Sequence, residues 1–422
     1  GVDVLLDALV RCLPNPLERK PIKAKKAKSD EEVEITPSEE GDFCALVFKT
    51  VADPYRGKLS LVRVFSGVQM ADSLTYNSTK DIKERIGQMF ALNGDQTEGV
   101  NSARAGDIVA IPKLKETQTG DTLCSESNPV ILPGFAWPQP VISFAVVPRT
   151  QQDEEKLTQA LSRLTEEDPT LQLKRDYQTN EFILSGMGQI HIETALERMK
   201  RKFGVEVELV KPKVPYRSTI RKKVEVQGKY KRQSGGRGQY GDCWLRLEPL
   251  PRGKDFDFVN AIVGGVIPSK YLPAVKKGIL EARQGSGLAG TKVVDFKVTC
   301  YDGSHHSVDS SDLAFKIAAS MGFKDGFNKA DPYLIEPIYN VEVLVPEEFM
   351  GDVMGDISAR RGKIMGMSPD GKLKRIKAQV PLAELYKYST SLRSLTQGRG
   401  THSREFSHYE EVPREIANKV IE

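Results

Sequence analysis

Tyr230-Lys-Arg-Gln-Ser-Gly-Gly-Arg-Gly-Gln-Tyr-Gly241 is a basic, glycine-rich stretch between two segments whose apolar residues alternate with polar ones. Before it, Val224 and Val226 are two positions apart, and after it the same spacing joins Cys243, Leu245 and Leu247. A period of two is typical of strands, so the stretch predicts the end of a hairpin arm. No acidic residue lies between positions 229 and 240, which contain four cations, Lys229, Lys231, Arg232 and Arg237. The end of the arm should therefore carry a positive potential that suits phosphate.

The glycines of this stretch allow other interpretations. Gly236, Gly238 and Gly241 fit the pattern G-x-G-x-x-G of dinucleotide-binding proteins. That motif leaves a strand and opens a helix, whereas here a second strand is expected to follow. A kinase-type glycine loop does lie between two strands, but the chain has neither its partner lysine strand nor an H-R-D segment. A mobile surface hairpin stays open on composition alone.

Length, charge and cysteine content limit the class of protein. A chain of 422 residues predicts about three domains. With 61 basic and 57 acidic residues the net charge is only +4, so contacts with nucleic acid must come from local patches. The chain has no run of about eighteen apolar residues, and we expect a soluble protein with no membrane partner. Its five cysteines form no C-x-x-C pair, which disfavours a zinc site or a disulfide scaffold and indicates a reducing compartment.

The first 132 residues divide into three segments. Residues 1–16 contain an apolar stripe at helical spacing that ends at two prolines, and such a stripe needs a covering surface. We expect this helix to be the last one of a preceding domain, and the chain to be the C-terminal part of a longer protein. Residues 17–41 are rich in Lys, Glu, Ser and Pro, a composition that predicts a linker without its own structure. Residues 42–132 contain short alternating segments separated by turn residues, which predict a small β-barrel.

The remainder of the chain repeats one architecture. Residues 139–214 follow the order βαββαβ, which predicts a ferredoxin-like domain. The hairpin arm belongs to an α+β domain over residues 215–335, in which Ser310 or Ser311 begins a long helix. Residues 336–407 show βαββαβ again, and residues 408–422 predict a C-terminal helix. The expected fold class is multidomain α/β and β, with a small β-barrel, two ferredoxin-like domains and an arm domain between them.

Several long motifs are similar to those of elongation factor G, the ribosomal translocase family, and occur in the family's order. They are Gly120-Asp-Thr-Leu123, Gly186-Met-Gly-Gln-Ile-His-Ile-Glu193, Gln233-Ser-Gly-Gly-Arg-Gly-Gln-Tyr-Gly241, Tyr301-Asp-Gly-Ser-His-His-Ser-Val-Asp-Ser-Ser311, Gly351-Asp-Val-Met-Gly-Asp356 and Arg360-Arg-Gly362. The resemblance covers nearly the whole chain, from the end of the family's GTPase domain to its C-terminus, and it implies that residues 1–16 are the last helix of a missing GTPase domain. Residues 241–249 resemble the second, paralogous form found in some bacteria more closely than the housekeeping form.

The resemblance implies a mechanical role in protein biosynthesis. In this family the arm enters the decoding site of the small subunit behind the moving tRNA, and the last domain touches RNA of the large subunit. The implied partners are ribosomal RNA of both subunits and the tRNA–mRNA complex, and the implied state is a cytoplasmic monomer. GTP and magnesium would be bound by the full-length protein. The resemblance implies no cofactor, metal or catalytic residue in this chain and no catalytic activity of the chain alone.

The resemblance also assigns candidate RNA-binding residues. At the tip of the arm these are Lys231, Arg232, Ser234, Gly235, Gly236, Arg237, Gly238, Gln239 and Tyr240, together with His305, His306 and Asp309 from a second loop. His306 matches the family's tip histidine, and His305 occupies a position that is usually aromatic. In the last domain the candidates are Arg360 and Arg361. Both arginines lie in the last turn of a predicted helix, where cations also complement the helix dipole, so capping and RNA contact both stay open.

Two further patterns suggest sites that we reject. His305, His306, Asp309 and Asp312 invite a metal site, but adjacent residues of an extended chain point to opposite faces, so the two histidines cannot easily share an ion. Asn328-Lys-Ala-Asp331 matches the guanine-reading N-K-x-D motif. The chain has no G-x-x-x-x-G-K-[ST] loop to hold a triphosphate, so we interpret this match as coincidence.

Three other functions remain to be weighed against translocation. A paralogue specialised for ribosome recycling or rescue would carry the same tip loops. An RNA-binding assembly protein without a motor role would need only the basic arm. A free-standing hydrolase or nucleotide enzyme is disfavoured, because the sequence has neither the phosphate loop nor a nucleophile and base at recognisable spacing.

Overall fold

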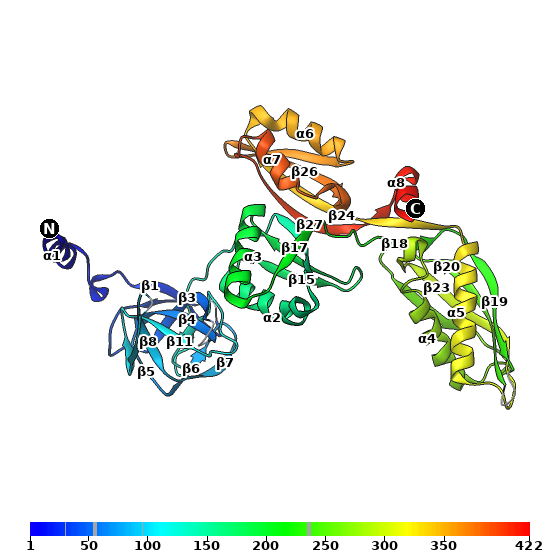
Figure 1. Ribbon diagram of the computed structural model, residues 1–422, viewed down its shortest axis with the longest axis horizontal. Helices are drawn as coiled ribbons and strands as arrows, with labels where there is room; N and C mark the ends of the chain where they lie inside the picture. Colours follow the sequence, from blue (N-terminus) through cyan, green and yellow to red (C-terminus); the bar gives the residue numbers. More distant parts are fainter. Residues whose placement is uncertain (30, 54–56, 95, 234–237) are drawn as a thin grey trace. The chain divides into compact units, whose positions relative to one another are not determined.

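The computed structural model describes residues 1–29, 31–53, 57–94, 96–233 and 238–422 (Figure 1). The chain forms two compact units. The first contains Gly1–Arg175 and Phe182–Val210, and the second contains Asp176–Glu181 and Lys211–Glu422. No described helix is both long and apolar enough to cross a membrane.

The N-terminal segment is more ordered than its composition predicts. After α1 (Val2–Cys12) and the 3-10 turn η1 (Pro16–Glu18), β1 (Ile22–Lys26) pairs antiparallel with β2 (Glu32–Ile35) and with β13 (Val130–Ile131). The prediction of an unstructured linker over residues 17–41 is therefore wrong for this hairpin.

The physical reason for this hairpin is a short alternating pattern hidden among the charges. Ile22, Ala24, Val33 and Ile35 pack onto a cluster of buried side chains that includes Cys44 and Cys124. Four apolar residues at a period of two are enough to bury one face of a small sheet when a neighbouring core is available.

The next segment forms a curved, barrel-like antiparallel sheet of eight strands in the order β7-β6-β12-β3-β4-β11-β8-β9. The strands are β3 (Cys44–Asp53), β4 (Gly57–Ser66), β6 (Ser73–Asn77), β7 (Ile82–Ile86), β8 (Met89–Asn93), β9 (Gln96–Val100), β11 (Ile108–Pro112) and β12 (Thr122–Cys124). A separate pair joins β5 (Val68–Met70) and β10 (Ser102–Arg104). The core is aliphatic and includes Val47, Val62, Ile86 and Met89.

The first unit ends with a βαββαβ domain, as the sequence predicts. Its elements are β14 (Ile142–Pro148), α2 (Gln151–Glu167), β15 (Gln172–Asp176), β16 (Glu181–Gly186), α3 (Gln189–Phe203) and β17 (Val207–Val210). The sheet order β15-β16-β14-β17 is that of a ferredoxin-like fold. The apolar faces of α2 and α3 are buried, and α3 ends at Gly204, whose left-handed φ of 64° suits glycine.

The arm domain packs two helices on one face of a four-stranded sheet with the order β19-β20-β23-β21 (Figure 1). The strands are β19 (Val224–Arg232), β20 (Gln239–Pro249), β21 (Phe256–Asn260) and β23 (Phe296–Ser304), and the helices are α4 (Leu272–Ala282) and α5 (Asp312–Lys329). Two 3-10 turns, η2 (Ser269–Tyr271) and η3 (Leu288–Gly290), flank α4. Ser311 caps α5, since its hydroxyl accepts a 3.2 Å bond from the Ala314 N–H. Of the two serines that the sequence offers as the start of this helix, Ser310 and Ser311, it is therefore Ser311 that begins it.

Glycines let α5 approach the hairpin closely. A Cβ at Gly228 would collide with the carbonyl oxygen of Ala318, and one at Gly241 would lie 2.6 Å from the carbonyl group of Ala314. On the helix, a Cβ at Gly322 would lie 2.9 Å from the Gly228 Cα. Larger residues at these positions would push the helix away from the sheet, so close backbone packing holds the arm together.

The second ferredoxin-like domain shares a long strand with the arm domain. β24 (Pro332–Val345) pairs with β18 (Arg217–Ile220) at its start and with β26 (Leu373–Pro381) further along, while β27 (Thr401–Glu411) lines its other edge. The sheet is completed by β22 (Lys292–Val293) beside β18 and β25 (Lys363–Asp370) beside β26. The helical elements are η4 (Glu347–Phe349), α6 (Met350–Ala359), η5 (Leu382–Glu384), α7 (Tyr388–Leu395) and α8 (Arg414–Ile421).

Candidate nucleic-acid interface

Three loops meet at one end of the arm. β21 runs parallel to β23, so their carboxyl ends lie at the same end of the sheet, where the β19–β20 hairpin also turns. The sequence predicts the hairpin turn and the loop after β23, but it does not predict the loop after β21, residues 261–268. One sequence signal could have revealed it, the adjacent Gly264 and Gly265, since a Gly-Gly pair marks a turn or loop. In the structure these glycines have φ values of 71° and 68°, and Val263 beside them is 81% exposed.

The hairpin contributes exposed cations. Lys231 pairs with Tyr240 and Arg232 with Gln239 in the last two rungs of β19 and β20. Both cations are exposed, and neither forms an ion pair with a residue that the structure describes. Four candidate residues, Ser234, Gly235, Gly236 and Arg237, lie outside the described residues.

Asp309 holds the two predicted loops together. Its Oδ1 accepts a 3.1 Å bond from the Gly238 N–H, and its carbonyl oxygen accepts a 2.9 Å bond from the Tyr240 N–H. A Cβ at Gly238 would lie 2.9 Å from the Asp309 carboxyl group, so this approach requires glycine. The Ser310 hydroxyl adds a 3.0 Å bond to the Tyr240 carbonyl. We therefore interpret Asp309 as a positioning residue, because its carboxylate would repel a phosphate.

The hydrogen bonds of His306 fix its neutral tautomer. Nδ1 accepts bonds from the N–H groups of Val308, at 3.3 Å, and Asp309, at 3.2 Å. A nitrogen that accepts both cannot carry a proton, so the ring proton lies on Nε2. The Asp309 carboxylate, 3.4 Å from Nδ1, would become a partner only for the cationic ring. The side chain is 55% exposed and Nε2 bonds no described residue, so Nε2–H is available as a donor.

His305 has the opposite arrangement. Its Nδ1 lies 3.1 Å from the carbonyl oxygen of Val266, which can only accept, so Nδ1 carries the proton. The bond ties the loop after β23 to the loop after β21. The two adjacent histidines thus both direct Nδ1 to the backbone, His305 as a donor and His306 as an acceptor. Among the described residues, no group of three or more His, Cys, Asp or Glu side chains is placed to hold a metal ion.

A polar network supports the tip from below. Asp242 is only 6% exposed, and its carboxylate accepts bonds from Gln227 Nε2 at 2.9 Å and Ser304 Oγ at 2.8 Å. The Tyr240 hydroxyl lies 2.7 Å from the same serine oxygen. The Tyr240 ring, 6.5 Å from the ring of His306, is thereby held at the base of both loops. These neutral donors satisfy the oxygens of a carboxylate that forms no ion pair with a described residue.

Arg360 and Arg361 are occupied by internal contacts. Arg361 binds Glu336 through two parallel bonds of 2.6 and 3.0 Å and Glu384 through a third of 3.0 Å. The bonds to Glu336, which is 1% exposed, raise the pKa of Arg361 further above its usual range. Arg360 donates to Asp356, to the Glu384 carbonyl and to Ser391. Of the two roles left open by the sequence, these contacts favour a structural one, because each guanidinium is already neutralised or saturated.

The N-K-x-D pattern lies in the wrong structural context for guanine recognition. Asn328 and Lys329 belong to the last turn of α5, and Asp331 follows it with a left-handed φ of 56°. The Asp331 carboxylate lies 3.5 Å from the ammonium group of Lys222. The pattern is therefore the end of a helix whose acidic residue is already paired.

The buried cysteines are unsuited to nucleophilic chemistry. Cys44 and Cys124 face each other across β3 and β12, and Cys243 and Cys300 lie in the core of the arm. Burial raises the pKa of Cys44 and of Cys300 to about 12. At neutral pH both are thiols, and it is the thiolate that reacts.

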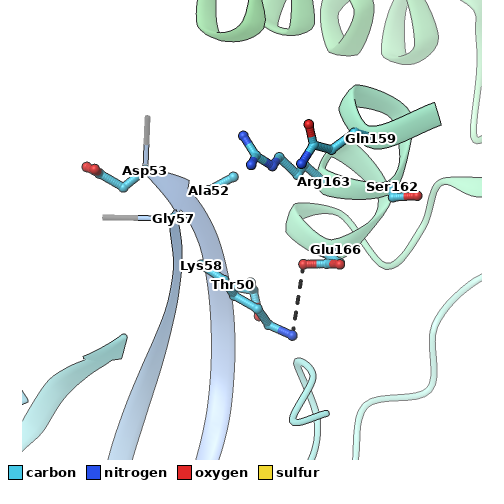
Figure 2. A pocket seen from close by; sticks show the side chains of 9 residues that line it. All are labelled: Thr50, Ala52, Asp53, Gly57, Lys58, Gln159, Ser162, Arg163 and Glu166. Carbon is cyan, nitrogen blue, oxygen red and sulfur yellow. Dashed lines mark ion pairs between the residues drawn. The ribbon is translucent and has the colours of Figure 1, made fainter. Parts of the chain in front are cut away.

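A small pocket lies in the first unit where β3 and β4 face α2 (Figure 2). Its volume is about 290 Å³, and Figure 2 shows Lys58 reaching towards Glu166, whose carboxylate is 3.9 Å away. Beside it, Glu167 Oε1 accepts bonds from the Ala52 N–H at 2.6 Å and from Lys202 at 2.5 Å. These contacts join β3 to the helical layer. The lining has equal numbers of cations and anions, so it shows no preference for a charged ligand.

Four family models together match most of the chain. They are elongation factor G domain 2 at residues 42–126, domain III at residues 137–211, domain IV at residues 212–331 and the elongation factor G C-terminus at residues 333–420. A crystal structure of a protein from Thermus thermophilus is similar over 100% of this chain, with 42% sequence identity and a TM-score of 0.81. The chain spans 60% of the length of that protein. The arm with the three loops is the segment that matches domain IV, and the chain belongs to the elongation factor G family.

Proposed function

We propose that this chain is the ribosome-binding part of a translation elongation factor that promotes movement of tRNA and mRNA, with the arm tip contacting RNA at the decoding site. Membership of the elongation factor G family supports this role. The proposal assigns GTP and magnesium to a nucleotide-binding domain outside the four matched segments. It assigns no catalytic step to the residues of this chain.

The observation that carries the proposal is the chemistry of the tip. Lys231 and Arg232 are exposed cations without a described partner, and His306 offers a hydrogen-bond donor from a loop that Asp309 holds in place. Unpaired cations beside a fixed donor suit the phosphates and base edges of RNA. The bonds described within the tip use His306 Nδ1 and the side chains of Asp309 and Ser310, which leaves Lys231, Arg232 and His306 Nε2 for a partner.

The salt dependence of ribosome binding tests this proposal. A chain with Lys231→Ala and Arg232→Ala should bind ribosomes more weakly, and the slope of log K against log salt should fall by about one unit for each phosphate that is no longer bound. The matched control is Lys276→Ala with Lys277→Ala, two adjacent exposed lysines on α4 of the same arm. The control makes the same change in net charge. Equal slopes for the two double variants would refute a specific role of the tip.

A further inference from the structure

The sheet of the arm has one face covered by α4 and α5 and an opposite face with an uneven distribution of charge. Side chains alternate along a strand, so the residues that lie between buried Cys243, Leu245 and Leu247 point outward. Starting from the tip, the outward pairs between β19 and β20 are Lys231 with Tyr240, Lys229 with Asp242, Gln227 with Trp244 and Glu225 with Arg246. The outer face therefore carries two aromatic side chains beside two lysines.

Trp244 is the unusual member of this face. It is 36% exposed in the middle of a paired strand, where it lies opposite Gln227 and Asp302. The side-chain amide of Gln227 donates its hydrogen bond to Asp242 and not to the Trp244 side. No described aromatic ring or cation stacks on Trp244, although such pairs are frequent elsewhere on this arm. A large aromatic surface is left open to solvent.

The charges on the face divide into two halves. Away from the tip, Arg246 binds Glu225 at 2.7 Å and stacks on Tyr301, and Lys223 and Lys297 both bind Glu248. In that half each of these three cations has a carboxylate partner. Nearer the tip, Lys229 and Lys231 have no ion pair with a described residue, and Asp242 between them is buried among neutral donors. The exposed indole thus lies near two lysines that form no ion pair with a described residue, and beside the exposed Asp302 of β23.

We infer that this half of the outer face, formed by Lys229, Lys231, Tyr240 and Trp244, is a platform for single-stranded RNA that extends the tip along the arm. Trp244 would stack on a base, and the two lysines would bind the flanking phosphates. Aromatic side chains bordered by cations are the usual means of binding single strands without strict sequence preference. The inference rests on the proposed function only in taking RNA as the ligand, and its test uses RNA without a ribosome.

The two tryptophans of the chain make the test direct. In a Trp137→Phe variant, Trp244 is the sole indole, and titration with a short oligouridylate at low salt should quench its fluorescence. A Trp244→Phe variant keeps only Trp137 and should show no such quenching. Trp244→Ala should weaken oligonucleotide binding, measured by anisotropy of a labelled strand, about tenfold or more, whereas Trp244→Phe should retain most of the affinity because it can still stack.

Two charge variants complete the experiment. Lys229→Ala with Lys231→Ala should reduce the salt slope by about 1.4 units, because each phosphate of a single strand contributes about 0.7. Asp302→Asn should tighten binding because it removes the exposed carboxylate opposite Trp244. Circular dichroism and thermal melting should show that all variants stay folded. Binding without quenching, or an unchanged affinity of Trp244→Ala, would overturn the platform, as would the lack of any oligonucleotide binding. The Trp244 variants change neither Lys231 nor Arg232, so their results are independent of the ribosome-binding slope of Lys231→Ala with Arg232→Ala, which tests the tip.

Discussion

Replacing His306 by asparagine or by glutamine separates two roles that an alanine variant removes together. Asparagine can place Oδ1 where Nδ1 of the histidine accepts the N–H groups of Val308 and Asp309, but it loses the Nε2–H donor. Glutamine reaches the position of Nε2 with an N–H donor and does not keep the Nδ1 acceptor. The pair of variants therefore separates the role of Nδ1 in ordering the loop from the role of Nε2–H as a donor to a partner.

The magnitudes follow from the hydrogen bonds. Each of the two loop bonds contributes about 0.5–1.5 kcal/mol, and the exposure of the loop places their combined effect at about 1 kcal/mol. A hydrogen bond from Nε2–H to a charged phosphate contributes about 1.5–3 kcal/mol, which corresponds to about 10- to 150-fold in the step that uses it. If the donor acts on RNA, its removal should outweigh the loss of loop order.

The assay is single-turnover tRNA movement by the full-length factor, with GTP hydrolysis measured in parallel. His306→Ala and His306→Asn should both slow movement at least tenfold, and His306→Gln should recover part of the rate. GTP hydrolysis should stay nearly unchanged, because the residue lies in the arm. Hydrogen exchange at residues 307–310 should show order in the asparagine variant and faster exchange in the alanine variant. A normal rate for asparagine with a slow rate for glutamine would show that loop order, rather than the donor, is what the residue supplies.

Three further predictions concern stability and nucleotide binding. Gly228→Ala should destabilise the arm by about 2 kcal/mol or more in urea unfolding, since its Cβ would meet the backbone of α5, whereas Gly355→Ala in α6, which has open space around it, should stabilise by about 0.5–1 kcal/mol. Burial beneath Tyr388, with Arg404 and Arg393 nearby, lowers the pKa of His402 to about 4. A histidine in the unfolded chain has a pKa of about 6.5, so the cost of burying the neutral ring does not depend on pH above that value. As the pH falls towards 4, the unfolded chain binds a proton that the folded chain does not, and the free energy of unfolding falls by up to about 3 kcal/mol. Unfolding of His402→Phe at pH 7 and 4.5 should show a smaller difference than the unchanged chain. The chain alone should not bind GTP at micromolar concentration, and calorimetric binding that Asp331→Ala abolishes would contradict this.

The sequence predicts the ferredoxin-like domains well because periodicity and caps agree in them. In α2 and α3 the apolar residues recur on one face, and the helix end at Gly204 has the left-handed backbone that glycine favours. The start of α5 at Ser311 follows from the same kind of local signal. In these elements the tertiary structure only reinforces what the local chemistry favours.

The features that the sequence does not predict depend on distant partners. Average composition hides the four apolar residues of the β1–β2 hairpin, and their burial needs a core supplied by β3 and β12. The roles of Asp309 and Arg361 likewise depend on residues far away along the chain, Gly238 and Glu336. A charge at a helix end or in a loop looks the same in sequence whether its partner is RNA or a buried carboxylate.

Pro337 in β24 lies at the junction of the arm and the last domain, although it does not end the strand as a proline often does. The sequence predicts a boundary between the arm and the last domain at residues 335 and 336, but β24 runs through this boundary and through Pro337 beside it. Along one edge, β18 pairs up to Ile335 and β26 begins at Ile338, so the proline lies in the gap between two partners, where no N–H is needed on that side. Glu336, beside the gap, receives the two bonds from Arg361. The carboxylate therefore links the end of α6 to the one strand that both domains share, which explains why Arg361, which resembles an RNA contact in sequence, is half-buried at this junction.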